Sequence, residues 1–452
     1  MDKKTETPCS RRAFVGGTTV ASALAAGKLV VPQVFAQAND EVRIALVGCG
    51  GRGTGAATNA LNVPKHIEGT KTNVKIVAMA DAFINKVEGS RNRLMKGNEA
   101  NVDVPADRRF EGFDAYKKAI DTPGVNLVIL TTPPGFRPIH LDYAIKAGKH
   151  VFMEKPVAVD AWGVNSVLAS TKLAKEKGLM LAVGLQRHHE DRYIETIKRV
   201  QDGAIGDVQY TRVYWNGGGV WTRDRAGLAK TLGREPTEME YQLNNWYYFN
   251  WLCGDHITEQ HIHNLDVSNW LYGEFPTRCE GMGGRQVRTG KENGQIFDHF
   301  FLQYDYANGK KMFSQCRHIR GCTNSVSEWA HGPDGTANLN GSITGKNPFN
   351  YRTPRGGNKQ GGHQTEWYDL IAALEKGEVY NEGEYGAMSS ATSVLGRVAA
   401  YTGKAVTMDA MLKSNFNLGP KSYDLSAEPP VLPNADGFYP VPMPGQYKPF
   451  KV

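Results

Sequence analysis

Residues 41–53 have the sequence EVRIALVGCGGRG, in which a run of aliphatic residues leads directly into a glycine-rich loop. The run predicts a buried strand, and the loop has its glycines at the spacing Gly-x-Gly-x-x-Gly. Gly48 permits a tight turn, Gly50 lets a phosphate approach the backbone, and Gly53 lets a following helix pack closely. Strand, loop and helix together predict a dinucleotide site, with contacts from Gly48, Gly50, Gly51, Arg52 and Gly53.

Later segments repeat the alternation of strand-like and helix-like sequence. Strand-like runs at 74–80, 125–130, 150–153 and 179–183 each end in a polar or proline-containing stretch. This alternation predicts a doubly wound parallel sheet, so we expect an α/β Rossmann domain at residues 39–185. Ligands of such sheets lie beyond the carboxyl ends of the strands. The residues that we expect at the cofactor from these ends are Asp81, Thr132, Pro133, Glu154, Lys155 and Gln186.

Asp81 also bears on the choice of cofactor. A carboxylate at the end of the second strand can accept hydrogen bonds from the adenosine ribose hydroxyls, and it would repel a 2′-phosphate. No arginine follows Asp81 immediately in the sequence. The sequence therefore favours NAD over NADP.

Two further motifs follow the glycine loop, Glu-Lys-Pro at 154–156 and Glu-x-x-x-His-x-x-Asp at 259–266. With the three motifs in this order the chain resembles the Gfo/Idh/MocA family, the group of glucose–fructose oxidoreductase and inositol dehydrogenase. The resemblance covers residues 41–410. It implies a second α/β domain, at residues 186–423, with a large, mostly antiparallel open sheet. It also implies a sugar or cyclitol substrate over the nicotinamide and a homo-oligomer, either a dimer or a tetramer.

Residues 254–272 contain the last motif, and we interpret them as one continuous helix. Glu259, His263, Asp266 and Trp270 recur at steps of four, three and four residues, so they would share one face of that helix. Oxidation of an alcohol needs a base that takes the hydroxyl proton as hydride leaves. Histidine suits this task because it titrates near neutral pH.

The resemblance assigns roles to these residues. It makes His263 the general acid/base and Lys155 the cation that polarises the hydroxyl or helps to deprotonate it. Glu259, where the family usually has aspartate, would orient His263 or hold a sugar hydroxyl, while Asp266 braces its neighbours. Lys155, His263 and Glu259 are thus the expected catalytic residues. We expect substrate contacts from Lys155, Arg187, Trp246, Glu259, His263 and His363.

Other interpretations of the same residues stay open. Lys155 could be a solvated lysine at a strand end, and His263 a core histidine held by a backbone carbonyl. The glycine-rich and aromatic stretches at 215–221 and 246–251 suit the faces and hydroxyl edges of a sugar, or they pack as loops or a subunit contact. His261 and His263 lie two positions apart, which is poor helical geometry for joint metal ligation. We therefore expect no metal.

The first residues predict export from the cytoplasm. Ser-Arg-Arg-Ala-Phe-Val at 10–15 matches the bacterial twin-arginine signal, and small residues at 36–38 suit signal peptidase. We expect cleavage near Ala38, a periplasmic or otherwise exported mature protein, and no stable membrane insertion. Residues 1–38 carry five basic and two acidic groups, so their removal lowers the formal charge from +7 to about +4, which gives no argument for nucleic acid.

Two local features remain. Five cysteines follow residue 38, without a Cys-x-x-Cys pair, and a bond between Cys316 and Cys322 is left open. The tail at 424–452 carries seven prolines from Glu428 onward, and we expect it to wrap the surface as extended chain.

The whole sequence predicts an exported, NAD-dependent oxidoreductase that acts on a hydroxyl of a sugar or cyclitol. Because free NAD is not recycled outside the cytoplasm, we expect the cofactor to stay bound through turnover. The alternative is an NAD-dependent glycoside hydrolase that works by transient oxidation, elimination, hydration and reduction. Such hydrolases resemble the same family, but the chain lacks their Tyr-Pro-Thr-His element. A non-catalytic sugar-binding relative is disfavoured because Lys155 and His263 are both present.

Overall fold

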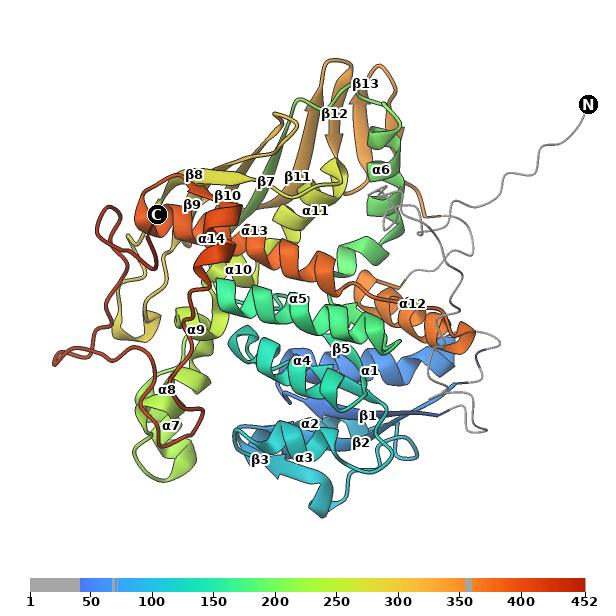
Figure 1. Ribbon diagram of the computed structural model, residues 1–452, viewed down its shortest axis with the longest axis vertical. Coiled ribbons are helices and arrows are strands. Elements are labelled where there is room, and N and C mark those ends of the chain that lie inside the picture. Colours follow the sequence, from blue (N-terminus) through green and yellow to red (C-terminus); the bar gives the residue numbers. More distant parts are fainter. Residues whose placement is uncertain (1–40, 67–69, 71, 354–359, 452) are drawn as a thin grey trace, which may run out of the picture.

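The computed structural model describes residues 41–66, 70, 72–353 and 360–451. The expected twin-arginine signal and its cleavage site lie outside these residues. Figure 1 shows a parallel sheet in the lower half of the molecule, a larger sheet at the top, and helices between them. Within this part of the chain, no helix is long and apolar enough to cross a membrane.

The first sheet is parallel and has six strands in the order β3-β2-β1-β4-β5-β6. The strand order changes direction between β1 and β4, which opens a crevice beyond their carboxyl ends. This topology confirms the predicted Rossmann domain. The strands are β1 (Glu41–Val47), β2 (Asn73–Asp81), β3 (Arg109–Glu111), β4 (Leu127–Leu130), β5 (His150–Met153) and β6 (Leu181–Val183).

Helices connect these strands and pack on the sheet, as the crossovers of a parallel sheet require. Because helices cover both faces, the central strands β4 and β5 are buried at every residue. The connecting helices are α1 (Gly51–His66), α2 (Ile84–Met95), α3 (Ala115–Ile120), α4 (Arg137–Lys146) and α5 (Ala161–Glu176).

The second sheet has nine strands in the order β14-β13-β12-β11-β7-β10-β9-β8-β15. Only β7 and β10 pair in parallel, so the expected mostly antiparallel sheet is confirmed. Its strands are β7 (Tyr210–Gly217), β8 (Arg278–Gly284), β9 (His299–Asp305), β10 (Lys311–His318), β11 (Ser325–Gly332), β12 (Gly335–Asn338), β13 (Ser342–Gly345), β14 (Phe349–Asn350) and β15 (Val406–Thr407).

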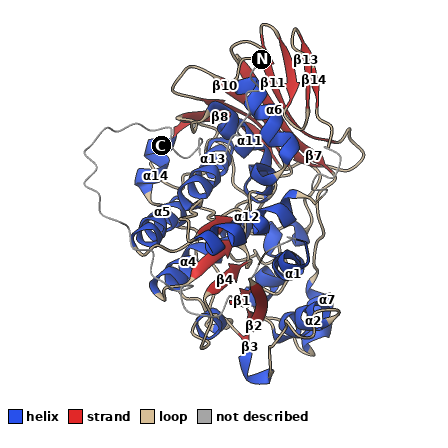
Figure 2. Ribbon diagram, turned by 90° about the vertical axis from the view of Figure 1, so that its right-hand side faces the viewer, coloured by secondary structure: helices blue, strands red, loops and turns tan. Residues whose placement is uncertain are grey.

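Among the described residues, helices lie on one face of the second sheet (Figure 1). Along β10, buried Met312 and Ser314 alternate with partly exposed Phe313 and Gln315, which is the pattern of a sheet packed on one side. Figure 2 shows α11 and α13 between this sheet and the first domain. The helices of this part include α6 (Asp191–Gln201), α9 (Asn250–Cys253), α11 (Ile262–Tyr272), α13 (Gly383–Thr402) and α14 (Met408–Ser414).

The chain returns to the first domain after the second sheet. α12 (Gly362–Lys376) packs on α1, and its fully buried Trp367 has its ring 4.5 Å from that of Phe152 on β5. α13 then packs against both α5 and β8. The crevice between the two sheets is therefore lined by residues that are far apart in the sequence.

Residues 254–272 do not form the single helix that the sequence predicts. The structure has α10 (His256–Glu259) and then α11, with a break at residues 260–261. In a continuous helix the carbonyl of Glu259 would accept from the N–H of His263. Here that carbonyl accepts from Lys155 Nζ at 2.6 Å, and the N–H of His263 donates to the carbonyl of Gln260 at 3.3 Å. Lys155 thus donates to the Glu259 carbonyl oxygen, which in a continuous helix would accept from a backbone N–H.

A segment of the second domain reaches down beside the first domain, and we call residues 218–249 the lid. It contains α7 (Arg225–Leu232) and α8 (Glu238–Asn244). We call residues 415–450 the strap; the strap has neither helix nor strand and passes around α7 and α8 (Figure 1). 

The cysteines of the described chain are all free thiols. Cys316 is buried on β10, whereas Cys322 is exposed in the following turn. The bond left open between them is therefore absent from this structure.

Candidate active site

The glycine loop borders a cleft of about 400 Å³ beyond the carboxyl ends of the first sheet. A Cβ at Gly50 or Gly51 would meet nothing within 4 Å, whereas one at Gly53 would lie 1.9 Å from the carbonyl oxygen of Gly48. Gly48 itself has a φ of +98°, which favours glycine. The loop is thus tightly packed against its own turn and open toward the cleft. This shape, at the start of α1, fits a pyrophosphate.

Asp81 ends β2 and lines the same cleft. Its Oδ2 accepts the N–H of Cys49 at 2.7 Å, and its Oδ1 accepts that of Phe83 at 3.1 Å. Burial raises the pKa of Asp81, while the bond from Cys49 opposes that rise. The carboxylate is held beside the glycine loop, where its other lone pairs can accept from ribose hydroxyls.

Thr132 and Pro133 form another edge of the cleft, just after β4. Arg137, which no sequence motif marks, fixes this edge. Its buried guanidinium donates to the carbonyls of Thr132 at 2.7 Å and of Glu154 at 2.9 Å. Burial lowers the pKa of Arg137 to about 10. One buried cation thereby ties the loops after β4 and β5 together.

Glu154 is buried under the glycine loop, and its Oε1 lies 2.8 Å from Nε of Arg52. Glu366 on α12 approaches the same carboxylate. Burial raises the pKa of Glu366 well above its usual range, and the charge of Glu154 raises it further. A neutral Glu366 avoids a second buried negative charge beside Glu154.

Lys155 reaches from the end of β5 to the end of α10. Its Nζ donates to the carbonyl of Glu259 at 2.6 Å and lies 3.3 Å from Glu259 Oε1. The two side chains are only 13% and 17% exposed, so Lys155 is not a solvated strand-end lysine. An ammonium has three N–H donors, so one remains for a ligand.

His263 lies on the first turn of α11 with its ring stacked on that of Trp215, 6.0 Å between centroids. Its Nδ1 is buried and has no hydrogen-bond partner among the described residues. Burial lowers the pKa of His263 well below its usual range, and the cations of Lys155 and Arg187 lower it further. The imidazole is therefore neutral at pH 7 and able to accept a proton.

Arg187 and Gln186 follow β6. Arg187 pairs with the fully buried Glu328 on β11, so its guanidinium is held by the second sheet. The Oε1 of Gln186 is buried and has no partner in the described chain, which leaves it available to a bound group. The structure thus pairs Arg187 with Glu328, and its contact with substrate stays a prediction.

His363 and Trp246 come from different elements, α12 and the lid. His363 is exposed at the start of α12; partial desolvation lowers its pKa, and the cation of Arg52 lowers it further. Trp246 lines the cleft beside the glycine loop, and its contact with substrate stays a prediction. Its neighbour Tyr247 is buried beside Glu259, whose charge adds to burial in raising the pKa of Tyr247. In the sequence, the signal for both residues is the aromatic stretch at 246–251.

Asp266 points away from this chemistry. Its side chain is 1% exposed, with Oδ2 2.8 Å from His188 Nε2 and Oδ1 accepting from Ser389 Oγ at 2.7 Å. Among the described residues, no three His, Cys, Asp or Glu side chains gather in a way that could hold a metal ion.

Residues 42–185 match the profile of GFO_IDH_MocA, an oxidoreductase family with an NAD-binding Rossmann fold. The match covers the strands and helices of the first domain. Among solved structures, levoglucosan dehydrogenase in complex with NADH and levoglucosan is similar, with a TM-score of 0.63 at 16% identity, covering 81% of this chain and 99% of that one. At that identity the likeness shows the fold alone.

Two curated relatives are similar in sequence. The chain is 27% identical to scyllo-inositol 2-dehydrogenase (NADP(+)) of Bacillus subtilis (strain 168), over 49% of this chain and 52% of that protein. It is 26% identical to glycosyl hydrolase family 109 protein 1 of Bacteroides fragilis (strain YCH46), over 56% of this chain and 50% of that protein. The chain spans about half the length of the curated relatives it matches.

Proposed function

We propose that this chain is an NAD(P)-dependent oxidoreductase that acts on a hydroxyl of a sugar or cyclitol. The observation that carries the proposal is the meeting of Lys155, Glu259 and His263 in the crevice beside the glycine loop. The names of the similar dehydrogenases, for an inositol and for levoglucosan, support the substrate class.

The residues of the chain handle the proton of the reaction. When bound, the nicotinamide takes up or gives a hydride. The free N–H of Lys155 donates to the substrate hydroxyl and stabilises negative charge on its oxygen. Neutral His263 accepts the hydroxyl proton during oxidation and returns it during reduction. Glu259 holds the ammonium in place and can accept from a second hydroxyl.

A substrate screen tests this proposal. Purified protein loaded with NAD or NADP is mixed with a panel of aldoses, cyclitols and anhydrosugars, and nicotinamide absorbance is followed. At least one member should reduce the nicotinamide. A loaded protein that is inert to the whole panel, in both directions, would contradict the proposal.

A second candidate is a redox-neutral glycoside hydrolase, favoured by the 26% identity to the family 109 hydrolase. In this reaction the transient ketone acidifies a neighbouring C–H, so the glycosidic oxygen leaves by elimination before water adds and the ketone is reduced. Hydrolysis of chromogenic glycosides without added cofactor supports this candidate. Reduction of bound NAD by free sugars with no hydrolysis excludes it.

We also propose export and a cofactor that is retained, with NAD preferred over NADP. The twin-arginine pattern at residues 10–15 supports export, and the position of Asp81 supports NAD. Fractionation of cells that produce the full chain, with an Arg11→Lys/Arg12→Lys variant as control, tests export. Assay of the supernatant of the denatured mature protein for nucleotide tests retention. A cytoplasmic mature protein, or a preparation free of nucleotide, contradicts the respective statement.

The uncovered face of the second sheet suits the homo-oligomer that we propose. Met282 and Phe301 are neighbours in register on that face and are 72% and 45% exposed. Light scattering should give the molar mass of a dimer or tetramer, and Phe301→Glu should shift the oligomeric state toward the monomer. A monomeric wild-type protein would contradict the proposal.

A further inference from the structure

The cofactor cleft has a wall that does not belong to the Rossmann domain. Besides the glycine loop and Asp81, it is lined by lid residues, which are Trp221, Arg223, Leu243, Asn244 and Trp246. A doubly wound sheet by itself leaves its ligand open to solvent on that side. The lid therefore encloses the half of the cleft next to Asp81, where the adenosine would lie.

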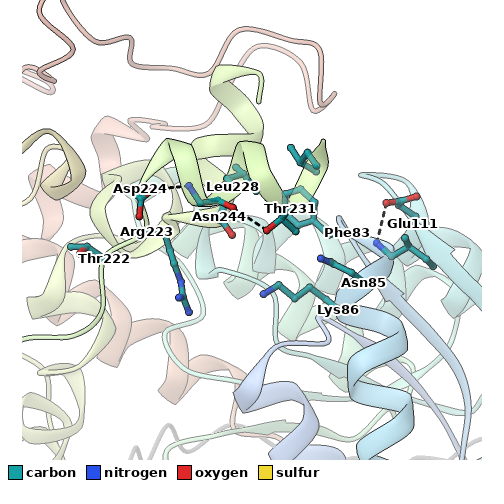
Figure 3. A pocket seen from close by; sticks show the side chains of 13 residues that line it. Phe83, Asn85, Lys86, Glu111, Thr222, Arg223, Asp224, Leu228, Thr231 and Asn244 are labelled. Atoms are coloured by element: carbon teal, nitrogen blue, oxygen red, sulfur yellow. Dashed lines mark hydrogen bonds between the residues drawn. The ribbon is translucent and has the colours of Figure 1, made fainter. Parts of the chain in front are cut away.

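A second cavity of about 540 Å³ adjoins this cleft, between the start of α2 and the helix α7 of the lid. Both cavities are lined by Lys86 from α2 and Arg223 from the lid. In Figure 3 the two side chains extend into the same open space from opposite sides. Neither makes an ion pair within the described chain, but the charge of Lys86 acts on Asp81 and opposes the rise in its pKa. Arg223 is therefore the cation available to an anion.

The acidic side chains of this cavity are already engaged. Asp224 accepts from the N–H of Gly227 at 2.6 Å, as the N-cap of α7. Glu111 accepts from the N–H of Ile84 at 2.9 Å. The guanidinium of Arg223 lies 5.1 Å from the ring of Trp221, which holds it over the cleft without neutralising it.

The strap ties the lid to the first domain. On the lid, Thr237 Oγ1 donates to the carbonyl of Leu425 at 2.8 Å, and Gln242 Nε2 donates to that of Val431 at 2.7 Å. Toward the first domain, the ring of Tyr423 lies 6.2 Å from that of Phe113 and 5.7 Å from that of Phe136. Phe113 and Phe136 line the cofactor cleft themselves.

We infer that the lid is a cofactor-binding element, in which Arg223 and Trp221 contact the phosphate-bearing adenosine half of the dinucleotide, and that the strap holds the lid closed. This inference rests on the proposed function, because it needs a bound nicotinamide dinucleotide. It explains how an exported enzyme keeps its cofactor. For the dinucleotide to dissociate, the lid has to move away from the first domain. The contacts of Tyr423 on the strap with Phe113 and Phe136 oppose that movement.

The rate at which bound NADH leaves the mature protein tests the inference. Protein loaded with NADH is mixed with excess NAD, and the loss of NADH fluorescence is followed. Arg223→Ala removes a charged contact to phosphate, so release should become about ten- to hundredfold faster. Trp221→Ala and Tyr423→Ala should also accelerate release. Because the contact is ionic, salt should accelerate release from wild type more than from Arg223→Ala.

Matched controls are available on the same elements. Lys230 is exposed on α7, and Leu432 is 43% exposed on the strap, so Lys230→Ala and Leu432→Ala should release NADH at the wild-type rate. If Tyr423→Ala fails to fold, the release rates of Arg223→Ala and Trp221→Ala still test the role of the lid. Both side chains are exposed in the cleft, so their removal should leave folding intact.

The two proposals fail in different ways. Wild-type protein that binds NADH but releases it no more slowly than Arg223→Ala and Trp221→Ala would overturn the role of the lid and leave the proposed function standing. Wild-type protein that binds neither NADH nor NADPH would overturn the proposed function itself.

Discussion

At the scale of single residues, the chemistry of Lys155 and His263 comes from neighbours that are remote in the sequence. Lys155 is held by Glu259, and the pKa of His263 is set by burial and by the cations of Lys155 and Arg187. The motifs marked both residues. They did not indicate that the carbonyl of Glu259, as well as its carboxylate, would meet the ammonium.

Lys155→Ala should lower kcat by about 10²- to 10⁴-fold, because it removes the group that polarises the hydroxyl. Because Lys155 is also expected at the cofactor, the loss of kcat should persist when the rate is expressed per bound nucleotide. Steady-state kinetics and nucleotide assay of the same preparation measure both. Lys172→Ala, an exposed lysine of α5, is the control and should behave as wild type. Undiminished turnover in Lys155→Ala would remove this residue from the mechanism.

The lowered pKa of His263 makes a prediction for the pH profile. Because the neutral imidazole is the base, oxidation should lose rate only well below pH 6.5, where His263 becomes protonated. In Lys155→Met a neighbouring cation is absent, so the pKa of His263 should rise toward 6.5. NMR titration of the imidazole measures this shift without need of activity. An equal pKa of His263 in both proteins would show that the charge of Lys155 does not lower it.

Asp81 should decide between the two forms of the cofactor. Asp81→Ser removes a negative charge next to the place of a 2′-phosphate, which is worth about 1–2 kcal/mol, or roughly tenfold in relative affinity. Calorimetric titration of nucleotide-free protein with NAD and NADP gives the ratio of the two dissociation constants. That ratio should move toward NADP, and a constant ratio would show that Asp81 does not discriminate.

At the scale of elements, α12 joins the second half of the chain to the first domain. Its partners α1 and β5 lie far away in the sequence. The break between α10 and α11 belongs to the same scale. Helical periodicity is a local signal, whereas the competing donor to the Glu259 carbonyl arrives from β5.

Trp367→Ala should lower the free energy of unfolding by about 3–5 kcal/mol, because it empties a fully buried site against Phe152. Urea denaturation measures the loss. Lys376→Ala, exposed on the same helix, is the control and should change stability by less than about 0.5 kcal/mol. A loss of unfolding free energy as small as that of the control would mean that the packing of α12 on the first domain contributes little to stability.

At the scale of the whole molecule, a buried histidine and two partly exposed carboxylates connect distant segments of the chain beside the crevice. His189, just after β6, has Nδ1 2.5 Å from Asp369 Oδ2 on α12 and Nε2 3.5 Å from Glu382 Oε1. Burial alone would lower the pKa of His189, but the bonds to Asp369 and Glu382 outweigh it and raise the pKa to about 10. The segment after the first sheet is thereby tied to the returning end of the chain.

This pair should make stability depend on pH. Since the folded-state pKa of His189 is raised, its contribution is complete below the unfolded value of 6.5 and is lost as pH rises toward about 10. Urea denaturation of wild type and His189→Gln at several pH values measures it. The difference between the two proteins should be largest at acid pH and shrink as pH rises. A difference that does not vary with pH would exclude the charged pair.

The sequence by itself determined the Rossmann domain, the glycine loop and the strand-end residues, because β-branched runs, glycine spacing and chain direction are local properties. It also marked Lys155 and His263 through motifs. Only the tertiary structure decided that Arg137 ties two loops together, that Glu366 lies near Glu154, that Arg187 is paired with Glu328, and that Trp246 lines the cleft beside the glycine loop. It alone placed the lid at the cleft and the strap against the lid. Each of these depends on contacts between distant segments, whose free energy no local pattern records.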